Sequence, residues 1–325
     1  MPRRIRAPLL FGLKLTLSGL LLWYVLRKVD SGGILERLRR ADLHWLLPSL
    51  LIGPAAIALS AWRWQVLSLG LLRYGEAVRY TWIGLFFGSI MPGMVGGDLA
   101  KGVSLAAKET RTRDARLPVS ILVDKFVGLW TLLLLFSVVA LVVLAQQPQL
   151  LAGMRGALWA GGGLAAGGLL AAAAICHPHG AACFAAFAAR LPTVPVRNAA
   201  TRLLAAFGSY GGQGRLLLRA ALISTALHGL NALSLWLVLR SLAIPATFWF
   251  AMIFYPLLSV LLALPVSISG VGVRDVFAAS MFTAFGLNPE SGVAFSWLLL
   301  GLSIPSALIG GGIQLWEMFR RRATD

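Results

Sequence analysis

Apolar runs of about 20 residues recur along this chain, and each is long enough to cross the hydrocarbon core of a bilayer as a helix. Lipid offers backbone polar groups no hydrogen-bond partner, so only helices and closed barrels can span a membrane. The runs are too long for barrel strands. We therefore predict an all-α polytopic membrane protein with one integral domain over residues 1–325. About six full spans fit, at residues 8–26, 44–62, 119–145, 158–176, 218–240 and 292–316.

Two phrases interrupt this apolar pattern at matching places in the two halves of the chain. Residues 91–101 read MPGMVGGDLAK and residues 264–275 read LPVSISGVGVRD. Proline removes a backbone donor and glycine removes rotational restraint, so each phrase predicts two short helices joined by a break. Broken helices in corresponding positions indicate a binding site in transporter-like folds. The break residues are Pro92, Gly93, Gly96 and Gly97 in the first phrase, and Pro265, Gly270 and Gly272 in the second.

The distribution of positive charge predicts the topology. The formal net charge is +17, but the basic residues lie mainly between apolar runs, which is typical of cytoplasmic loops and not of nucleic-acid binding. Cytoplasmic termini follow if hairpins over residues 80–108 and 248–286 enter the membrane from opposite sides as an inverted repeat. The basic segment 27–42 then falls outside, against the rule, unless it forms an interfacial helix. An amphipathic surface helix is expected within residues 184–210.

Charged residues open the second arm of each predicted hairpin. Lys101 and Arg274 stand where helix N-termini present unpaired amide groups, so they are candidates for binding a lipid phosphate. Asp98 and Asp275 are expected to cap their helices or to balance the cations. The alternative is a pair of structural salt bridges. Intramembrane charge favours the lipid-binding interpretation.

Further polar residues inside apolar runs are weaker candidates. Asp124 and Lys125 either complete the site or lie at the interface. Arg63 stands between two tryptophans, and this placement favours an interface anchor over a headgroup contact. His228 and Asn231 share a helix face and are expected to join helices, with a headgroup role as the alternative.

Glycine spacing predicts close helix contacts, and no pattern predicts a metal. The pairs Gly84 and Gly88, and Gly163 and Gly167, are four residues apart, which favours close helix packing. The spacing of the two cysteines, Cys176 and Cys183, and of their neighbours His177 and His179 matches no common zinc site. We expect no metal and no cofactor.

Four ordered motifs resemble one known family. AWRWQVL at 61–67, the 91–101 phrase, VDKFVGL at 123–129 and the 265–275 phrase are similar to boxes of the lysylphosphatidylglycerol synthase transmembrane, or flippase-like, family. The resemblance implies an integral protein of a bacterial or archaeal cytoplasmic membrane, related to the domain that moves aminoacylated phosphatidylglycerol between leaflets. Three departures are Asp124 and Lys125 in place of a Glu-Arg pair, Asp275 in place of Glu, and no soluble aminoacyl-transfer domain after Asp325, so synthase activity is not expected.

These observations predict a protein that moves an anionic or headgroup-modified lipid between leaflets. The substrate is left open among phospholipids, glycolipids and polyprenyl phosphates. One alternative is a membrane scaffold or regulator of a partner lipid synthase, and another is an intramembrane lipid transferase with Asp98 or Asp275 as its base. No nucleophile elbow, Walker loop or zincin helix stands out, so we expect a transporter and not an enzyme. Membrane lipids are the expected partners, and an oligomeric assembly stays open.

Overall fold

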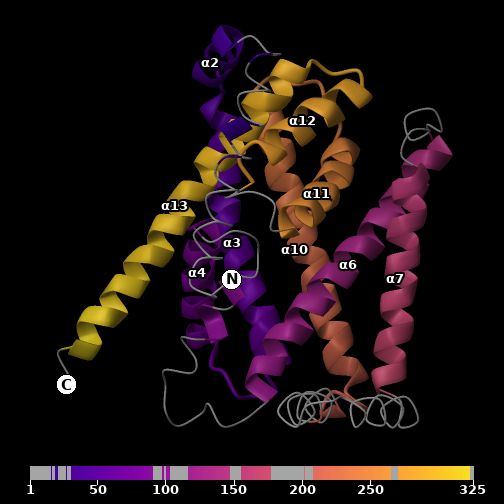
Figure 1. The fold of residues 1–325 in the computed structure, drawn as a ribbon, viewed down its shortest axis with the longest axis vertical. Coiled ribbons are helices and arrows are strands. Elements are labelled where there is room, and N and C mark those ends of the chain that lie inside the picture. The colour runs from indigo at the N-terminus through magenta and orange to yellow at the C-terminus, as the bar shows by residue number, and fades with distance from the viewer. Residues whose placement is uncertain are drawn as a thin grey trace, which may run out of the picture. The chain divides into compact units, whose positions relative to one another are not determined.

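A computed structural model describes most of the chain, and every regular element in the described residues is helical (Figure 1). The described residues are 31–90, 97–98, 100–102, 116–146, 155–176, 208–264 and 270–322, together with residues 16, 19, 20, 27 and 201. The helices are α2 (Ser31–Arg39), α3 (Leu43–Leu67), α4 (Tyr74–Ile90), α6 (Arg116–Gln146), α7 (Arg155–Cys176), α10 (Gly214–Ser241), α11 (Phe248–Ala263), α12 (Val273–Ala284) and α13 (Pro289–Arg322).

Four of the described helices, α3, α6, α10 and α13, are long and apolar enough to cross a membrane. Each coincides with a span predicted from hydropathy, because burial in lipid requires an unbroken apolar run whatever the packing. The predicted span at 158–176 forms the helix α7. Almost all of the predicted span at 8–26 and of the amphipathic segment 184–210 lies outside the described residues. Segment 27–42 contains a separate short helix, α2, as an interfacial segment would.

The chain divides into two compact units. Unit 1 contains residues 1–57, 79–101 and 229–325, and unit 2 contains residues 58–78 and 102–228. The helices α3, α4 and α10 each pass from one unit into the other. Both broken phrases belong to unit 1.

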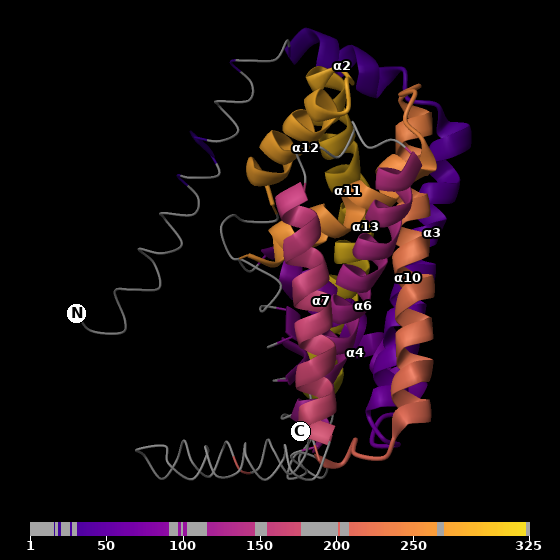
Figure 2. The same ribbon diagram turned by 90° about the vertical axis from the view of Figure 1, so that its right-hand side faces the viewer.

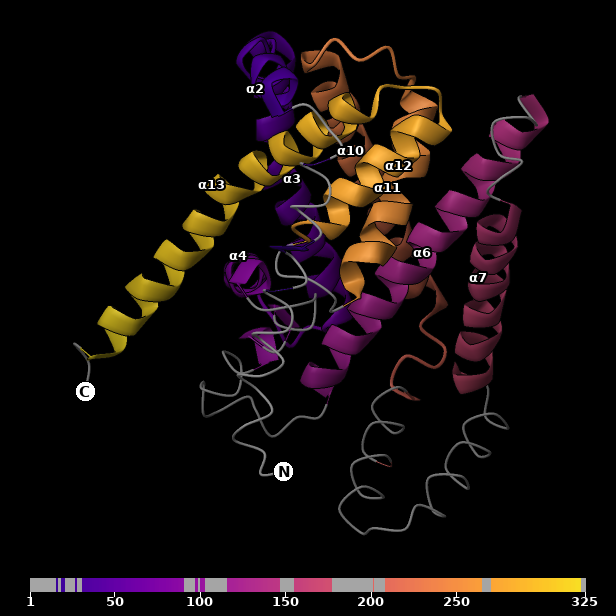
Figure 3. The same ribbon diagram turned by 45° about the horizontal axis from the view of Figure 1, so that its top comes forward.

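In unit 1 the second phrase forms the predicted break between α11 and α12, which pack on each other and on α13 (Figure 3). Thr247 caps α11 by accepting a hydrogen bond from the Phe250 amide. After the break, Gly270 and Gly272 have φ angles of 75° and 79°, a region that glycine enters without steric cost. Aromatic contacts hold the hairpin together. Phe254 of α11 contacts Phe277 and Phe282 of α12 and Phe295 of α13, with ring centroids 5.1–6.4 Å apart. Phe282 also contacts Phe250 and Phe295, at 5.4 and 5.7 Å.

The described end of the first phrase lies back against α4. A Cβ on Gly97 would stand 2.5 Å from the carbonyl oxygen of Gly84, so the two backbones touch where neither residue has a side chain. A Cβ on Gly88 would stand 3.9 Å from the Cα of Gly97. The close packing predicted for the Gly84 and Gly88 pair is therefore confirmed. Pro92, Gly93, Gly96 and Pro265 lie outside the described residues.

In unit 2, α6 and α7 run side by side (Figure 2). The indole of Trp130 donates a hydrogen bond of 2.9 Å to the Ala165 carbonyl across this interface. The prediction that Gly163 and Gly167 make the close contact is wrong. Within the described part of the chain nothing lies within 4 Å of a Cβ on either, whereas Gly161 and Gly168 face Phe136 and Trp130. The face that α7 turns toward α6 is set by packing, which glycine spacing alone does not record.

Candidate membrane-embedded polar sites

The first turn of α12 carries a buried polar cluster of unit 1. Gly272, with its positive φ, ends the break and opens the helix, so that Asp275 stands at the third helical position. The carboxylate of Asp275 accepts a hydrogen bond of 3.0 Å from the Gly272 amide, one of the unpaired donors at the helix start. Asp275 is 1% exposed. One of the two roles predicted for it, helix capping, is therefore confirmed.

A serine on α13 connects this cap to Arg274. The Ser296 hydroxyl donates to the second carboxylate oxygen of Asp275 and accepts a hydrogen bond of 2.8 Å from the Nε of Arg274. All three side chains are buried. Arg274 is thus buried, and the Ser296 hydroxyl bridges its guanidinium to the negative charge of Asp275.

The terminal nitrogens of Arg274 are the distinctive feature of this cluster. Within the described residues only its Nε makes a hydrogen bond, and neither Nη group has a hydrogen-bond partner. These two groups form the fork with which arginine binds a phosphate or carboxylate in two parallel hydrogen bonds. The cluster therefore holds a positioned guanidinium that can bind an anion.

The first phrase places its charges in a different arrangement. Lys101 and Asp98 form an ion pair of 3.9 Å one helical turn apart, with side chains 12% and 21% exposed. The aliphatic part of Lys101 packs on Gly84, where a Cβ would stand 3.0 Å from its Cε. This short-range pair matches the predicted structural alternative as well as a balanced headgroup site.

A second buried cluster, in unit 2, is built around Arg63. Its Nε and Nη2 donate to the two carboxylate oxygens of Asp124 at 2.7 and 3.0 Å. Its Nη1 donates to the Ser224 hydroxyl at 2.9 Å. The guanidinium therefore forms a bidentate ion pair with Asp124 on α6 and a further hydrogen bond to Ser224 on α10. Unlike Arg274, Arg63 has all three of its nitrogens bonded within the protein.

The prediction of Arg63 as an interface anchor is wrong. The residue is 6% exposed, whereas the neighbouring Trp62 is 37% exposed. Successive residues of a helix point about 100° apart, so an interfacial tryptophan and a buried arginine can be adjacent in sequence. Asp124 is buried with Arg63, while the adjacent Lys125 is only partly buried.

Small and hydroxyl side chains make room for this pair. Gly128 lies one turn after Asp124 on α6, and a Cβ there would stand 2.9 Å from the Nη1 of Arg63. The Gly128 carbonyl lies 3.0 Å from the Nε2 of His228, which also lies 3.2 Å from the Thr131 hydroxyl. His228 therefore joins α10 to α6, as predicted for polar contacts between helices. Asn231, one turn further along α10, is partly buried.

A buried tyrosine, Tyr210, packs against the last residue of α3 in unit 2. The Tyr210 hydroxyl donates to the Leu67 carbonyl and packs in a cluster with Val119, Val123 and Ala220. Burial, and then the negative charge of Asp124, raises the pKa of Tyr210 to about 12.

Sequence reasoning missed the hydroxyl partners of both clusters, Ser224 and Ser296, as well as Gly128. A single serine or glycine in an apolar helix occurs for many reasons, so no sequence signal distinguished these. Gly128 had the clearest signal, since it lies four residues after Asp124 and so on the same helix face. The predicted cysteine and histidine positions beyond Cys176 lie outside the described residues.

Comparison with known proteins gives one finding. The model of the family described as "Lysylphosphatidylglycerol synthase TM region" matches residues 11–310, nearly the whole chain. The resemblance indicated by the four motifs is confirmed. Comparison with curated proteins and with solved structures gives no significant match.

Proposed function

Because this chain belongs to the family of the lysylphosphatidylglycerol synthase TM region, we propose that it moves an anionic or headgroup-modified lipid between the leaflets of a membrane. Its family and its apolar helices make it a membrane protein with a lipid-related function. Its location in the cytoplasmic membrane is part of the same proposal.

The single observation that carries the proposal is the fork of Arg274. A buried guanidinium in an apolar unit is costly, and such residues in membrane proteins usually serve a transported group. Arg274 is held by one hydrogen bond at Nε, and its Nη groups make no hydrogen bond to any described residue. A phosphate there gains two charge-assisted hydrogen bonds together with the positive end of α12.

The broken helices support the same proposal. At 1.5 Å per residue, α11 and α12 are about 24 Å and 18 Å long, which is less than the roughly 30 Å of a hydrocarbon core. We propose that they form a re-entrant hairpin, and that α4 with the helical residues after Gly97 forms its inverted counterpart. A headgroup at the ends of such arms exchanges its water shell for fixed donors, which reduces the desolvation cost of several kcal/mol per ion.

The geometry argues against the transferase alternative at Asp275. One of its oxygens accepts from the Gly272 amide and the other from the Ser296 hydroxyl. A general base must instead reach a substrate proton. Asp275 therefore serves better as a cap than as a base.

Transbilayer movement of a fluorescent phosphatidylglycerol tests the proposal. The purified protein is reconstituted into vesicles labelled in the inner leaflet, and loss of fluorescence to an external quencher reports lipid arriving outside. We expect Arg274→Gln to slow this movement at least tenfold, and Arg274→Lys to retain part of it because the charge remains. Lys101→Ala is expected to slow it as well.

Arg240→Gln is the matched control. Arg240 is exposed at the end of α10 and stacks on tryptophan rings, outside the proposed site. Equal rates in wild type, Arg274→Gln and Arg240→Gln would contradict the site. Chemical modification of the lipid would favour a transferase, and movement only after a partner synthase is added would favour a regulator.

A further inference from the structure

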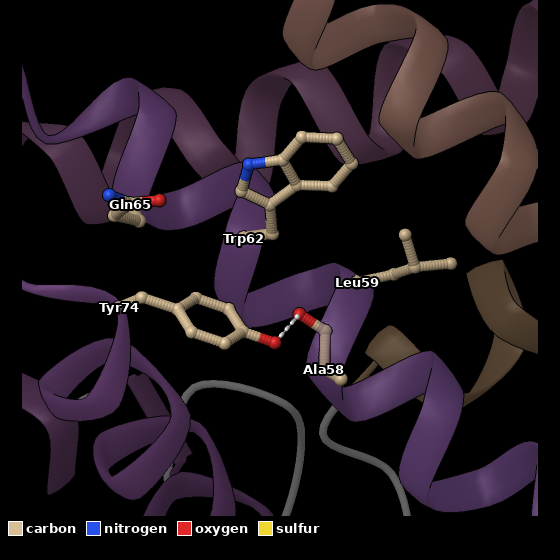
Figure 4. Close-up of a pocket in the computed structure, with 5 residues that line it drawn as sticks. All are labelled: Ala58, Leu59, Trp62, Gln65 and Tyr74. Atoms are coloured by element: carbon tan, nitrogen blue, oxygen red, sulfur yellow. Dashed lines mark hydrogen bonds between the residues drawn. The ribbon is translucent and has the colours of Figure 1, made fainter.

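Unit 2 contains a groove that none of the features described above uses. It has a volume of about 360 Å³ and lies beside the last turns of α3 (Figure 4). Ala58, Leu59, Trp62 and Gln65 of α3 line it, together with Tyr74 at the start of α4. The four α3 residues recur at helical spacing, so one face of the helix forms the floor.

A tight turn brings Tyr74 back onto this face. Leu69 and Gly70 have φ angles of 53° and 81°, so the chain reverses directly after α3. The Tyr74 hydroxyl then donates a hydrogen bond of 3.3 Å to the Ala58 carbonyl, as Figure 4 shows. The tyrosine ring forms a wall of the groove. The Ala58 carbonyl can accept the hydrogen bond from its hydroxyl in addition to the bond within the helix, because a carbonyl oxygen has two lone pairs.

The groove has an apolar part and a part with hydrogen-bond donors. Ala58 and Leu59 provide only methyl and methylene groups. The indole N–H of Trp62 and the side-chain amide of Gln65 have no hydrogen-bond partner within the described residues. The guanidinium of Arg219 lies 5.3 Å from the centroid of the Trp62 ring, and none of the described residues that line the groove carries a carboxylate. Its polar part therefore complements an anion.

The surroundings identify the class of ligand. α3 is one of the helices long and apolar enough to cross a membrane, and the groove lies within its last ten residues. Tryptophan and tyrosine are enriched at the level of lipid headgroups, because the apolar part of the ring contacts acyl chains while its N–H or O–H contacts water and headgroups. At that depth the molecule with an apolar chain and an adjoining anion is a phospholipid.

We propose that this groove binds one anionic phospholipid, with an acyl chain along Ala58 and Leu59 and the phosphate at Trp62, Gln65 and Arg219. A volume of about 360 Å³ is at the lower end of ligand pockets, which suits a headgroup and the start of one chain. The site is separate from Arg274, which belongs to unit 1. It does not depend on the proposed transport, because binding is measured without any transbilayer movement.

Native mass spectrometry of the full-length protein, stripped of lipid in detergent and titrated with phosphatidylglycerol, tests this proposal. Leu59→Phe narrows the apolar part, and Arg219→Gln removes the cation. We expect each to weaken the tightest phosphatidylglycerol binding at least fivefold. Phosphatidylcholine, which carries no net charge, should bind more weakly to the wild type and be less affected by Arg219→Gln.

Arg240→Gln is the matched control, because Arg240 lies on the same helix and also stacks on tryptophan, with ring distances of 5.4 and 5.9 Å. It should change binding less than twofold. Circular dichroism checks that every variant is folded. If the larger side chain of Leu59→Phe unfolds α3, Leu59→Val replaces it and weakens binding by removing apolar contact instead of by narrowing the groove. Unchanged binding in both groove variants, loss in only one of them, or displacement of the lipid by inorganic phosphate would each overturn the proposal.

Discussion

Replacing Asp124 with asparagine measures how much the buried ion pair between Arg63 and Asp124 contributes to the free energy of unfolding. The side chains of Arg63 and Asp124 are each 8% exposed, so water replaces little of a lost bond. Asparagine keeps the shape of the side chain but turns one acceptor into a donor, which then faces an N–H of the guanidinium. The charge of Arg63 is left with only Ser224 and one amide oxygen as acceptors among these partners.

The expected loss is large because a charge stays buried without its partner. Breaking a buried ion pair in this way costs about 3–5 kcal/mol, out of a total stability of about 5–15 kcal/mol. At about 1.4 kcal/mol per tenfold, the unfolding equilibrium shifts by roughly two to more than three powers of ten. Equilibrium unfolding in mixed micelles, followed by circular dichroism, measures this shift.

An exposed pair provides the control. Arg40 and Glu36 form an ion pair with side chains 78% and 60% exposed, so Glu36→Gln should cost less than about 1 kcal/mol. The double variant Arg63→Gln with Asp124→Asn should regain much of the stability, because two neutral amides can bond each other. A loss in Asp124→Asn no larger than in Glu36→Gln, or a double variant equal to the sum of the two single losses, would refute the reasoning.

Three further outcomes follow from the structure. A Cβ on Gly310 would overlap the backbone carbonyl oxygen of Trp82 on α4, so Gly310→Ala should destabilise the protein by about 1–3 kcal/mol in the same unfolding assay. Gly312→Ala, with nothing within 4 Å, should not, and equal effects would contradict the contact. Since the pKa of Tyr210 rises from 10.0 to about 12 on folding, its stabilising contribution should be complete below pH 10 and disappear by pH 12. Tyr210→Phe should flatten that decline, and an unchanged pH profile would show that Tyr210 does not cause it. With both native cysteines replaced, a cysteine at Asn288 should react only with reagent added outside, and labelling from the cytoplasm would end the inverted-repeat proposal.

The sequence was a good guide to the helices and to the break. The spans at α3, α6, α10 and α13 were predicted within a few residues, because an apolar run is a property of the run itself. The break between α11 and α12 followed from proline and glycine, which act on the local backbone. Capping by Asp275 is also local, since donor and acceptor are three residues apart.

Partners distant in the sequence could not be predicted in this way. Arg63 and Asp124 are 61 residues apart, and each had a plausible role alone, as an anchor beside two tryptophans and as a headgroup contact. Ser296 is 22 residues from Arg274 and carries no signal that distinguishes it from other serines. The groove also needs the turn at Leu69 to return Tyr74 to α3.

The sequence alone therefore determined which of the described segments are helical and that a break separates α11 from α12. Only the tertiary structure decided that Arg63 is fully bonded while the terminal nitrogens of Arg274 bond no described residue. It also decided that α7 meets α6 through Gly161 and Gly168 and not through Gly163 and Gly167. The physical reason is that hydropathy and backbone freedom act over a few neighbouring residues. The partner of a side chain depends instead on how each helix is rotated about its axis, and that rotation is set by the packing of all its neighbours together.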